Sequence, residues 1–326
     1  MSTGERVAPP LRVSVVVPVR DEEASLGALV ESLQSQTFAP DEIVIVDGGS
    51  TDATAALARR LAEEDARVRF IEAGEATPGR GRNVGTEAAR SEWVAYVDAG
   101  IRVEPTWLER LVREVERDPT LEVVFGNYEP VARTRFERLA ALAYVAPKRP
   151  RPGGQMRGPV VPSSLMRREV WRAAGGFPDM RAAEDLIFIE RVMALGRGVG
   201  WSPAATVWWH VQPSFRTTFR RFTLYSRHNV WAGRQSDWHH GVARNCLVQL
   251  PFVALALLHS VYWLIVPVLF TLARVLKTLW ARREGRGFVW LLNPARVAGV
   301  GAILLTIDAA TLFGWAQATL LRRWYR

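Results

Sequence analysis

The sequence contains very little cysteine. Its 326 residues include a single one, Cys246. One thiol excludes an intrachain disulfide framework and any metal site built from several cysteines. This usage is typical of a reducing compartment, or of a chain that does not depend on oxidation. Zinc-finger spacing and other nucleic-acid motifs are also absent, so no nucleic-acid partner is expected.

Acidic residues are outnumbered by basic ones, 33 to 42, which gives a formal net charge of +9 at pH 7. Arginine carries it far more than lysine, and the basic residues gather beside apolar runs. The three groups are Arg216, Arg220, Arg221, Arg227, Arg234 and Arg244; Arg274, Lys277, Arg282, Arg283 and Arg286; and Arg322, Arg323 and Arg326. Basic residues that flank apolar segments favour anionic lipid headgroups over DNA as the partner.

The chain up to residue 120 alternates short β-branched runs with segments of helical periodicity. The pattern predicts strands at 13–17, 43–46, 68–71 and 93–97, helices at 22–36, 51–64 and 106–117, and a turn followed by a helix at 80–89. Such βαβ repetition predicts a parallel sheet in an α/β layered domain. Ligands of open α/β sheets bind outside the carboxyl ends of the strands, and here each strand ends in a polar, acidic or glycine-rich turn.

After residue 120 the predicted strands and helices alternate less regularly. The pattern predicts strands at 121–125, 160–166 and 207–210, helices at 168–174 and 184–195, and a mobile loop at 147–159. The stretch 215–231 mixes aromatic residues and arginines at helical spacing. It predicts an interfacial segment at about 213–235 that lies on a membrane surface, or else a solvated helix packed on the catalytic domain.

Two nearly uncharged segments, 247–273 and 298–321, are long enough to cross a bilayer. They predict a membrane hairpin, and the alternative is two buried helices of a soluble domain. A two-span hairpin would leave the basic linker 274–286 on the far side of the membrane, against the positive-inside tendency. Either the segments re-enter or lie along the interface, or the basic surface of the catalytic domain decides the topology.

Several carboxylates follow predicted strands. Asp47 ends the second strand before two glycines, where it can bind a base or ribose, or can simply form a tight turn. Asp98 ends the fourth strand, where it can coordinate a divalent ion or can simply belong to a strand-end turn. Glu184 and Asp185 open a helix, either as capping acids or with Asp185 as a general base. His210 closes a strand-like run as a structural residue or as a contact for metal or phosphate.

A glycine–arginine stretch, 79–85, follows the third strand. Backbone amides of a glycine-rich turn, with Arg80 and Arg82, can hold a pyrophosphate. Surface turns of this composition are also common, so the pattern alone does not decide between the two.

In their order and spacing these segments resemble the family 2 glycosyltransferases over residues 11–235. The matching segments are Val13-Ser-Val-Val-Val-Pro-Val-Arg-Asp-Glu-Glu, Asp47-Gly-Gly-Ser-Thr-Asp, Gly81-Arg-Asn-Val-Gly, Val97-Asp-Ala-Gly, Gly175-Gly-Phe-Pro and Ala183-Glu-Asp. The resemblance implies the GT-A fold, a Rossmann-like α/β sandwich, as a catalytic domain over 1–235. Membrane-associated helices at 246–326 would follow it.

The resemblance also implies roles for individual residues. The donor nucleotide sugar would be bound by Pro18, Val19, Asp21, Glu22, Asp47, Gly81, Arg82, Asn83 and Asp98. Asp98 would hold a divalent cation, Mg²⁺ or Mn²⁺, with His210 as a further ligand. Asp185 would be the catalytic base, with Glu184 beside it. The family's second metal-binding aspartate is replaced by Gly100, and the Gln-x-x-Arg-Trp motif of processive synthases is absent.

These implications predict an inverting enzyme that moves a single sugar from a nucleotide-sugar donor to a lipid-linked or cell-envelope glycan acceptor. A polyprenyl-phosphate glycosyltransferase is the second interpretation. The third, motivated by Gly100, is a degenerate, non-catalytic membrane protein that binds nucleotide sugars. The expected location is the cytoplasmic membrane, with the catalytic domain facing the cytoplasm.

Overall fold

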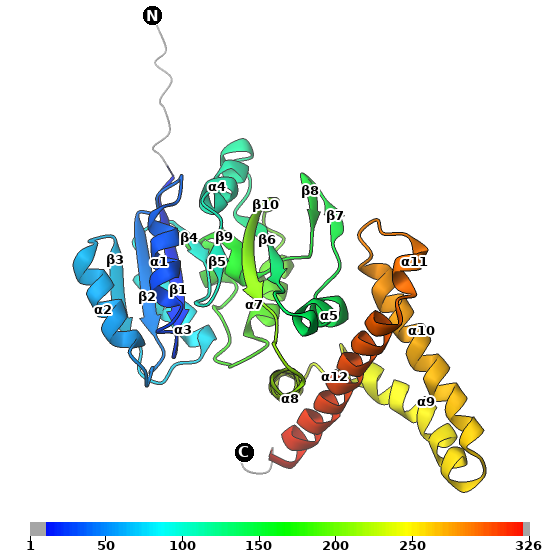
Figure 1. Cartoon of the computed structure of the whole chain (residues 1–326). Coiled ribbons are helices and arrows are strands. Elements are labelled where there is room, and N and C mark those ends of the chain that lie inside the picture. The colour runs from blue at the N-terminus through cyan, green and yellow to red at the C-terminus, as the bar shows by residue number, and fades with distance from the viewer. Residues whose placement is uncertain (1–10, 322–326) are drawn as a thin grey trace, which may run out of the picture. The chain divides into compact units, whose positions relative to one another are not determined.

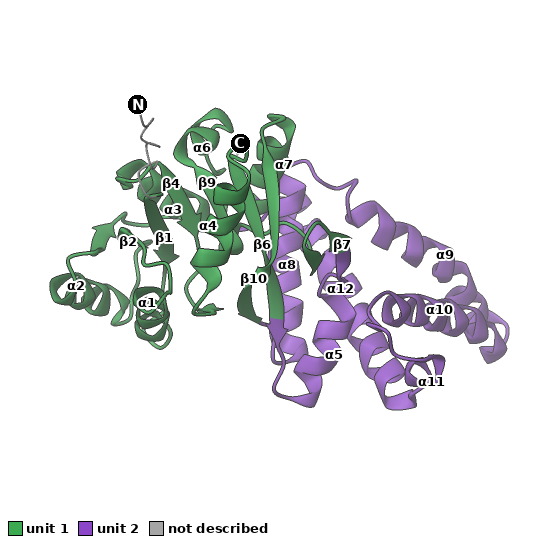
Figure 2. Cartoon of the chain, turned by 90° about the horizontal axis from the view of Figure 1, so that it is seen from above, with its two compact units in different colours: residues 1–129, 150–180, 184–209 green, residues 130–149, 181–183, 210–326 purple. Residues whose placement is uncertain are grey.

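The computed structural model describes residues 11–321, which form two compact units (Figure 2). Within this range, unit 1 holds residues 11–129, 150–180 and 184–209, and unit 2 holds 130–149, 181–183 and 210–321. The unit boundary does not coincide with the predicted division at residues 235–246. The third basic group, at residues 322–326, lies outside the described residues.

An eight-stranded sheet forms the centre of unit 1 (Figure 1). Its spatial order is β3 (Val68–Glu72), β2 (Glu42–Asp47), β1 (Val13–Val19), β4 (Trp93–Tyr96), β9 (Ser164–Arg167), β6 (Val123–Val131), β10 (Val199–His210) and β5 (Arg102–Val103). The pairs β1–β2, β1–β4 and β2–β3 are parallel, as predicted. The pairs β4–β9, β6–β9 and β5–β10 are antiparallel, so the sheet is mixed rather than parallel throughout.

Both faces of the sheet are covered by apolar side chains. The helices of unit 1 are α1 (Leu26–Gln34), α2 (Thr54–Glu64), α3 (Pro78–Ala88), α4 (Trp107–Arg117), α6 (Arg168–Ala173) and α7 (Glu184–Ala194). Along β1, Val15 and Val17 join one core cluster together with α1 and α4, while Val16 joins the other with α6 and α7. Successive side chains of a strand point to opposite faces, so a β-branched run buried on both sides suits this central strand.

The stretch 147–159, predicted as a mobile loop, contains a small two-stranded sheet. Its strands are β7 (Arg149–Arg151) and β8 (Gly154–Met156), and the 3₁₀ helix η1 (Val161–Ser163) follows. Gly153 has φ of 82°, which glycine adopts without steric cost and which the turn between the two strands requires. The loop prediction was therefore wrong for these two strands.

Unit 2 is helical. Its elements are α5 (Arg135–Tyr144), α8 (Phe215–Trp231), α9 (His239–Leu258), η2 (Val261–Leu264), α10 (Ile265–Ala281), α11 (Phe288–Leu291) and α12 (Pro294–Leu321). The predicted helix over 215–231 is α8, which starts at a capping box formed by Ser214 and Thr217. A Cβ on Gly314 of α12 would lie 2.6 Å from the carbonyl oxygen of Thr223, so this glycine lets α8 and α12 approach closely.

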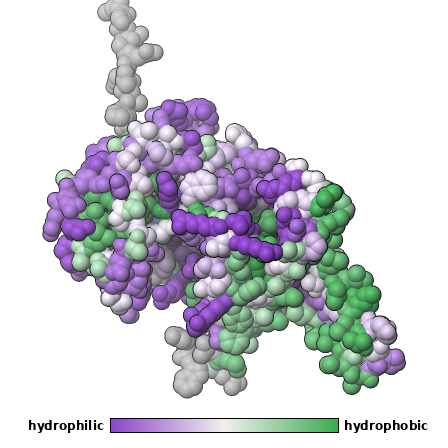
Figure 3. Space-filling view, viewed as in Figure 1, coloured by the Kyte–Doolittle hydropathy of each residue, from purple (hydrophilic) through white to green (hydrophobic). Residues whose placement is uncertain are grey.

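The predicted apolar segment 247–273 is not one helix. It is divided at His259 and Ser260 between α9 and α10, which lie side by side as a hairpin (Figures 1 and 2). Three stretches, His239–Leu258, Val261–Ala281 and Pro294–Leu320, are long and apolar enough to cross a membrane. Apolar side chains are exposed along the hairpin, among them Leu257 at 82% and Leu258 at 87% (Figure 3).

Candidate functional site

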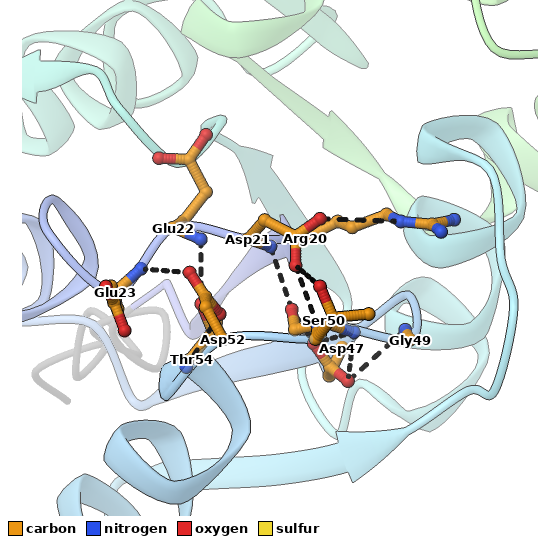
Figure 4. Close-up of polar contacts among 10 residues, drawn as sticks. Arg20, Asp21, Glu22, Glu23, Asp47, Gly49, Ser50, Asp52 and Thr54 are labelled. Atoms are coloured by element: carbon orange, nitrogen blue, oxygen red, sulfur yellow. Dashed lines mark hydrogen bonds and ion pairs between the residues drawn. The ribbon is translucent and has the colours of Figure 1, made fainter.

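The carboxyl ends of β1 and β2 are joined by hydrogen bonds between the two following loops (Figure 4). The Asp21 amide donates to Ser50 Oγ at 2.9 Å, and the Thr51 amide donates to Asp21 Oδ1 at 2.7 Å. The Glu22 amide donates to Thr54 Oγ1 at 2.7 Å. Asp21 has φ of 56°, and the Thr51 amide above all lowers the pKa of its carboxyl. The two loops therefore form one ordered edge of unit 1.

Asp47 lies within this edge, 5% exposed, and its carboxylate receives local donors. The amides of Gly49 and Ser50 donate to Asp47 Oδ2 at 3.2 and 3.1 Å. This is the tight-turn arrangement that the sequence left open beside nucleotide binding. Pro18 and Val19 end β1 at the same edge, and the Val19 carbonyl accepts from the Gly48 amide at 2.9 Å.

The glycine–arginine stretch 79–85 is not a turn. It lies inside α3, where the Gly81 amide donates to the Thr77 carbonyl at 2.8 Å. A Cβ on Gly81 would lie 3.2 Å from Pro18 Cβ, and one on Gly85 would lie 2.5 Å from Val16 Cγ1. The glycines therefore let α3 pack closely on β1, and the stretch predicted to begin as a turn is helical from Pro78 onward.

Arg82 projects from α3 and is 3% exposed. Its Nη2 donates to Asp98 Oδ1 at 2.6 Å, and its Nη1 donates to Glu184 Oε1 at 3.0 Å. Burial by itself would lower the pKa of Arg82, but the charges of Asp98 and Glu184 outweigh burial and raise it. Its guanidinium is thus held between two carboxylates, a geometry different from the diphosphate contact implied by the sequence.

Asp98 and Glu184 contact this guanidinium, and Asp185 is close enough to feel its charge. Burial raises the pKa of Glu184 and of Asp185, while the charge of Arg82 lowers both and the negative charge of Asp98 raises that of Asp185. With three carboxylates and one guanidinium, the group carries a net negative charge when all are ionised. A raised carboxyl pKa near a partly exposed surface is typical of a general base.

The side chain of Asn83 forms hydrogen bonds on both sides of the loop that contains Gly175 and Gly176. Its Oδ1 accepts from the Phe177 amide at 2.8 Å and from Trp171 Nε1 at 2.9 Å, and its Nδ2 donates to the Phe177 carbonyl at 2.8 Å. Asn83 thus ties α3 to the segment that leads to α7. The residue predicted to lie near the diphosphate has its amide groups engaged within the protein.

The metal ligands expected from the sequence are not gathered into a cage. Within residues 11–321 no group of three or more His, Cys, Asp or Glu side chains could hold a metal ion. His210, the last residue of β10, is exposed and belongs to unit 2. Asp98 has a side chain that is 33% exposed, and Arg82 occupies its Oδ1. A cation at Asp98 would therefore need its remaining ligands from other groups, such as donor phosphates and water.

Sequence reasoning missed the carboxylate of Glu22 as a neighbour of position 100. A Cβ built on Gly100 would lie 3.4 Å from Glu22 Oε2. In Figure 4 this carboxylate points away from the network of Asp47 and Ser50. The signal in the sequence was the glycine at the place of an expected aspartate, combined with the acidic run that follows β1.

Comparisons with known proteins agree with this geometry. Residues 14–173 match the family model described as Glycosyl transferase family 2. The chain is 31% identical over 175 residues to the succinoglycan biosynthesis protein ExoA of Rhizobium meliloti, covering 51% of this chain and 52% of that protein. It is 32% identical over 117 residues to the glycosyltransferase GlyG of Streptococcus pneumoniae, covering 36% and 38%. The matches thus span about half or less of these relatives.

Among solved structures, the fold is similar to that of the mannosyltransferase PcManGT from Pyrobaculum calidifontis in complex with GDP-Man and Mn²⁺. The TM-score is 0.55 at 20% identity, over 93% of this chain and 87% of that one. Residues 14–173 thus carry a family 2 glycosyltransferase domain, and the predicted GT-A fold is confirmed. The family match ends before Glu184 and Asp185, so the roles of these two acids depend on the geometry around Arg82.

Proposed function

We propose that this protein is an inverting glycosyltransferase that moves a single sugar from a nucleotide-sugar donor to a lipid-linked or cell-envelope glycan acceptor. The observation that carries the proposal is the Arg82 cluster within a family 2 domain. There one guanidinium holds Asp98 at 2.6 Å and Glu184 at 3.0 Å, and Asp185 follows directly in the chain. Family membership and the GDP-Man of PcManGT support a nucleotide-sugar donor.

Asp185 would take the proton from the attacking acceptor hydroxyl. Its raised pKa brings a carboxyl group closer to the range in which a base accepts a proton efficiently near neutral pH. Glu184 is 6% exposed and bound to Arg82, so it would position the first turn of α7 rather than exchange protons with the acceptor. Ala183, the neighbour of Glu184, has φ of 71°, a strained conformation typical of functional sites.

A divalent cation fits this site through Asp98, because the cluster carries more carboxylates than cationic groups. When bound, it would neutralise negative charge that develops on the departing nucleotide diphosphate. The Mn²⁺ in PcManGT supports a divalent ion here without specifying which one. Asp47, Asp21 and Glu22 would line the nucleotide side of the site, on the edge formed by β1 and β2.

The C-terminal helices would attach the protein to the cytoplasmic membrane. The stretch from Asn245 to Ala273 contains no Asp, Glu, Lys or Arg. Because α9 and α10 form a hairpin, the basic linker after α10 returns to the side on which α9 begins. Arg244 and the arginines of α8 adjoin the start of α9, and Arg282, Arg283 and Arg286 follow α10. This arrangement relieves the charge conflict of two spans and favours a cytoplasmic catalytic domain.

The proposal is tested by screening the purified full chain against a panel of nucleotide sugars, with and without Mg²⁺ or Mn²⁺. We expect turnover with one donor, loss of turnover in Asp185→Asn, and retained donor binding in that variant. Donor binding without turnover across all donors and lipid acceptors would instead support the non-catalytic alternative. A product that is a polyprenyl-phosphate sugar would support the second interpretation.

A further inference from the structure

Unit 2 contains a group of basic side chains that lack acidic partners among the described residues. Arg227 and His228 are neighbours on α8, and the charge of Arg181, which precedes α7, also acts on His228. Among residues 11–321, none of these three side chains forms an ion pair with a carboxylate. We call Arg181, Arg227 and His228 the α8 cationic cluster.

Two polar atoms of this cluster are buried without a hydrogen-bond partner. They are Arg227 Nε and His228 Nδ1. Buried polar groups in proteins are nearly always hydrogen-bonded, so each unpaired group calls for a partner that the chain itself does not provide. Trp231, one turn further along α8, has its ring centroid 5.1 Å from that of His228 and 5.9 Å from the guanidinium carbon of Arg227. The ring of Trp231 therefore lies beside both residues that carry the unpaired atoms.

The environment of the cluster disfavours a positive charge on His228. Burial first, and then the charges of Arg227 and Arg181, lower the pKa of His228 to about 4. By contrast, Arg234 of the same unit pairs with Asp237 at 2.7 Å. The α8 cationic cluster contains no such carboxylate, so an anionic ligand would complement its positive charge and pair with the Arg227 Nε donor.

We propose that the α8 cationic cluster binds a phosphate-bearing group of a substrate of the transfer reaction. Hydrogen bonds from arginine to phosphate are charge-assisted and roughly twice as strong as those between neutral groups. Arg181 lies three residues before Glu184 in the sequence, so the cluster is linked through a short segment to the acids of the proposed catalytic site. The proposal rests on the proposed function and adds to it the residues that recognise a phosphate.

The phosphate can come from the donor nucleotide diphosphate or from a phosphorylated lipid acceptor. The chemistry is the same, and the probes separate the two sources. Binding to the full chain in detergent is measured by calorimetry with a nucleoside diphosphate, with inorganic pyrophosphate, and with a short-chain polyprenyl monophosphate against the corresponding polyprenol. These measurements need no turnover, so they remain informative if the proposed function fails.

The variants are Arg227→Gln and His228→Gln, with Arg220→Gln as the matched control. Arg220 is an exposed arginine of the same helix, so its replacement removes the same charge outside the cluster. We expect Arg227→Gln to weaken binding of one phosphate probe by about 10- to 100-fold, as loss of a hydrogen bond to a charged group predicts. Arg220→Gln should stay within about twofold of the wild type.

A second readout follows His228 directly. The chain has five histidines, so labelled imidazole signals can be assigned with the His228→Gln variant. A phosphate placed in the cluster should raise the pKa of His228, because a nearby anion favours the protonated ring. The proposal is overturned if all phosphate probes bind both cluster variants as they bind the wild type. It is also overturned if Arg220→Gln loses as much affinity, or if the His228 pKa is the same with and without the bound probe.

Discussion

The carboxylate of Glu22 lies beside position 100: a Cβ built on Gly100 would be 3.4 Å from Glu22 Oε2 and 3.7 Å from Oε1. Gly100 has φ of 77°, a conformation that L side chains rarely adopt. Position 100 is where the family resemblance leads one to expect an aspartate. Here an acid that follows β1 supplies negative charge next to this position, and glycine leaves room for it.

Restoring the expected aspartate should therefore be harmful. Gly100→Asp combines backbone strain with repulsion from Glu22, and we expect a loss of about 2 kcal/mol in unfolding free energy. Chemical denaturation measures this loss. Gly100→Asn separates the causes, since asparagine tolerates positive φ and carries no charge. Adding Glu22→Gln to Gly100→Asp should recover part of the stability, and a stable, fully active Gly100→Asp protein would contradict this reading.

Replacing Asp185 should stop the chemical step while leaving the donor bound. General-base catalysis contributes about 10²- to 10⁴-fold, so we expect a fall of that order in kcat for Asp185→Asn. Steady-state kinetics with the donor found by screening measures kcat and KM separately. Glu190→Gln, an exposed acid of the same helix, is the control and should retain activity. An equal loss in both variants would remove Asp185 from its proposed role.

Arg82 should control the pH dependence through Asp185. Burial raises the pKa of Asp185, and the charge of Arg82 opposes this rise. Arg82→Gln removes the opposing charge, so the acid limb of kcat/KM should move to higher pH, while Arg82→Lys should keep it close to the wild type. Because Arg82→Gln leaves Glu184 buried without its cation, we also expect a stability loss of about 3 kcal/mol. If the acid limb of kcat/KM stays at the same pH in folded Arg82→Gln, the proposed influence of Arg82 on the pKa of Asp185 is contradicted.

The proposed role of Asp98 in binding a divalent cation can be tested by removing the metal. We expect a chelator to abolish transfer and added Mg²⁺ or Mn²⁺ to restore it. Asp98→Asn should weaken Mn²⁺ binding, followed by electron paramagnetic resonance in the presence of a nucleoside diphosphate. Asp179→Asn is a control, because its carboxylate accepts from Thr77 Oγ1 at 2.6 Å outside the Arg82 cluster. Full activity in chelator would overturn the metal role of Asp98.

The close packing of α3 can be tested at its glycines. A Cβ on Gly79 would lie 2.1 Å from the carbonyl oxygen of Pro178, so Gly79→Ala should destabilise the protein by about 2 kcal/mol through overpacking. Gly27 lies within α1 with nothing within 4 Å of such a Cβ, and Gly27→Ala should stabilise by up to about 1 kcal/mol. Thermal or chemical unfolding compares the two, and equal effects would contradict the packing argument.

Features of local origin were predictable from the sequence. The β-branched runs of β1 and β2, the acids at their carboxyl ends and the helical spacing of α8 depend on residues close together in the chain. The same patterns, together with the family resemblance, predicted the GT-A fold. The predicted site acids Asp47, Asp98, Glu184 and Asp185 all belong to unit 1, and two of them, Asp98 and Glu184, pair with Arg82.

Only the tertiary structure decided which partners these residues have. Arg82 and Glu184 are 102 positions apart, and no local periodicity indicates that a residue read as a phosphate ligand instead bridges two carboxylates. The glycines of 79–85 are compatible in sequence with either a turn or a helix. In the structure they belong to a helix because their lack of side chains lets α3 pack closely on β1. Likewise, composition identifies 247–273 as apolar, while the packing of α9 against α10 divides it into a hairpin.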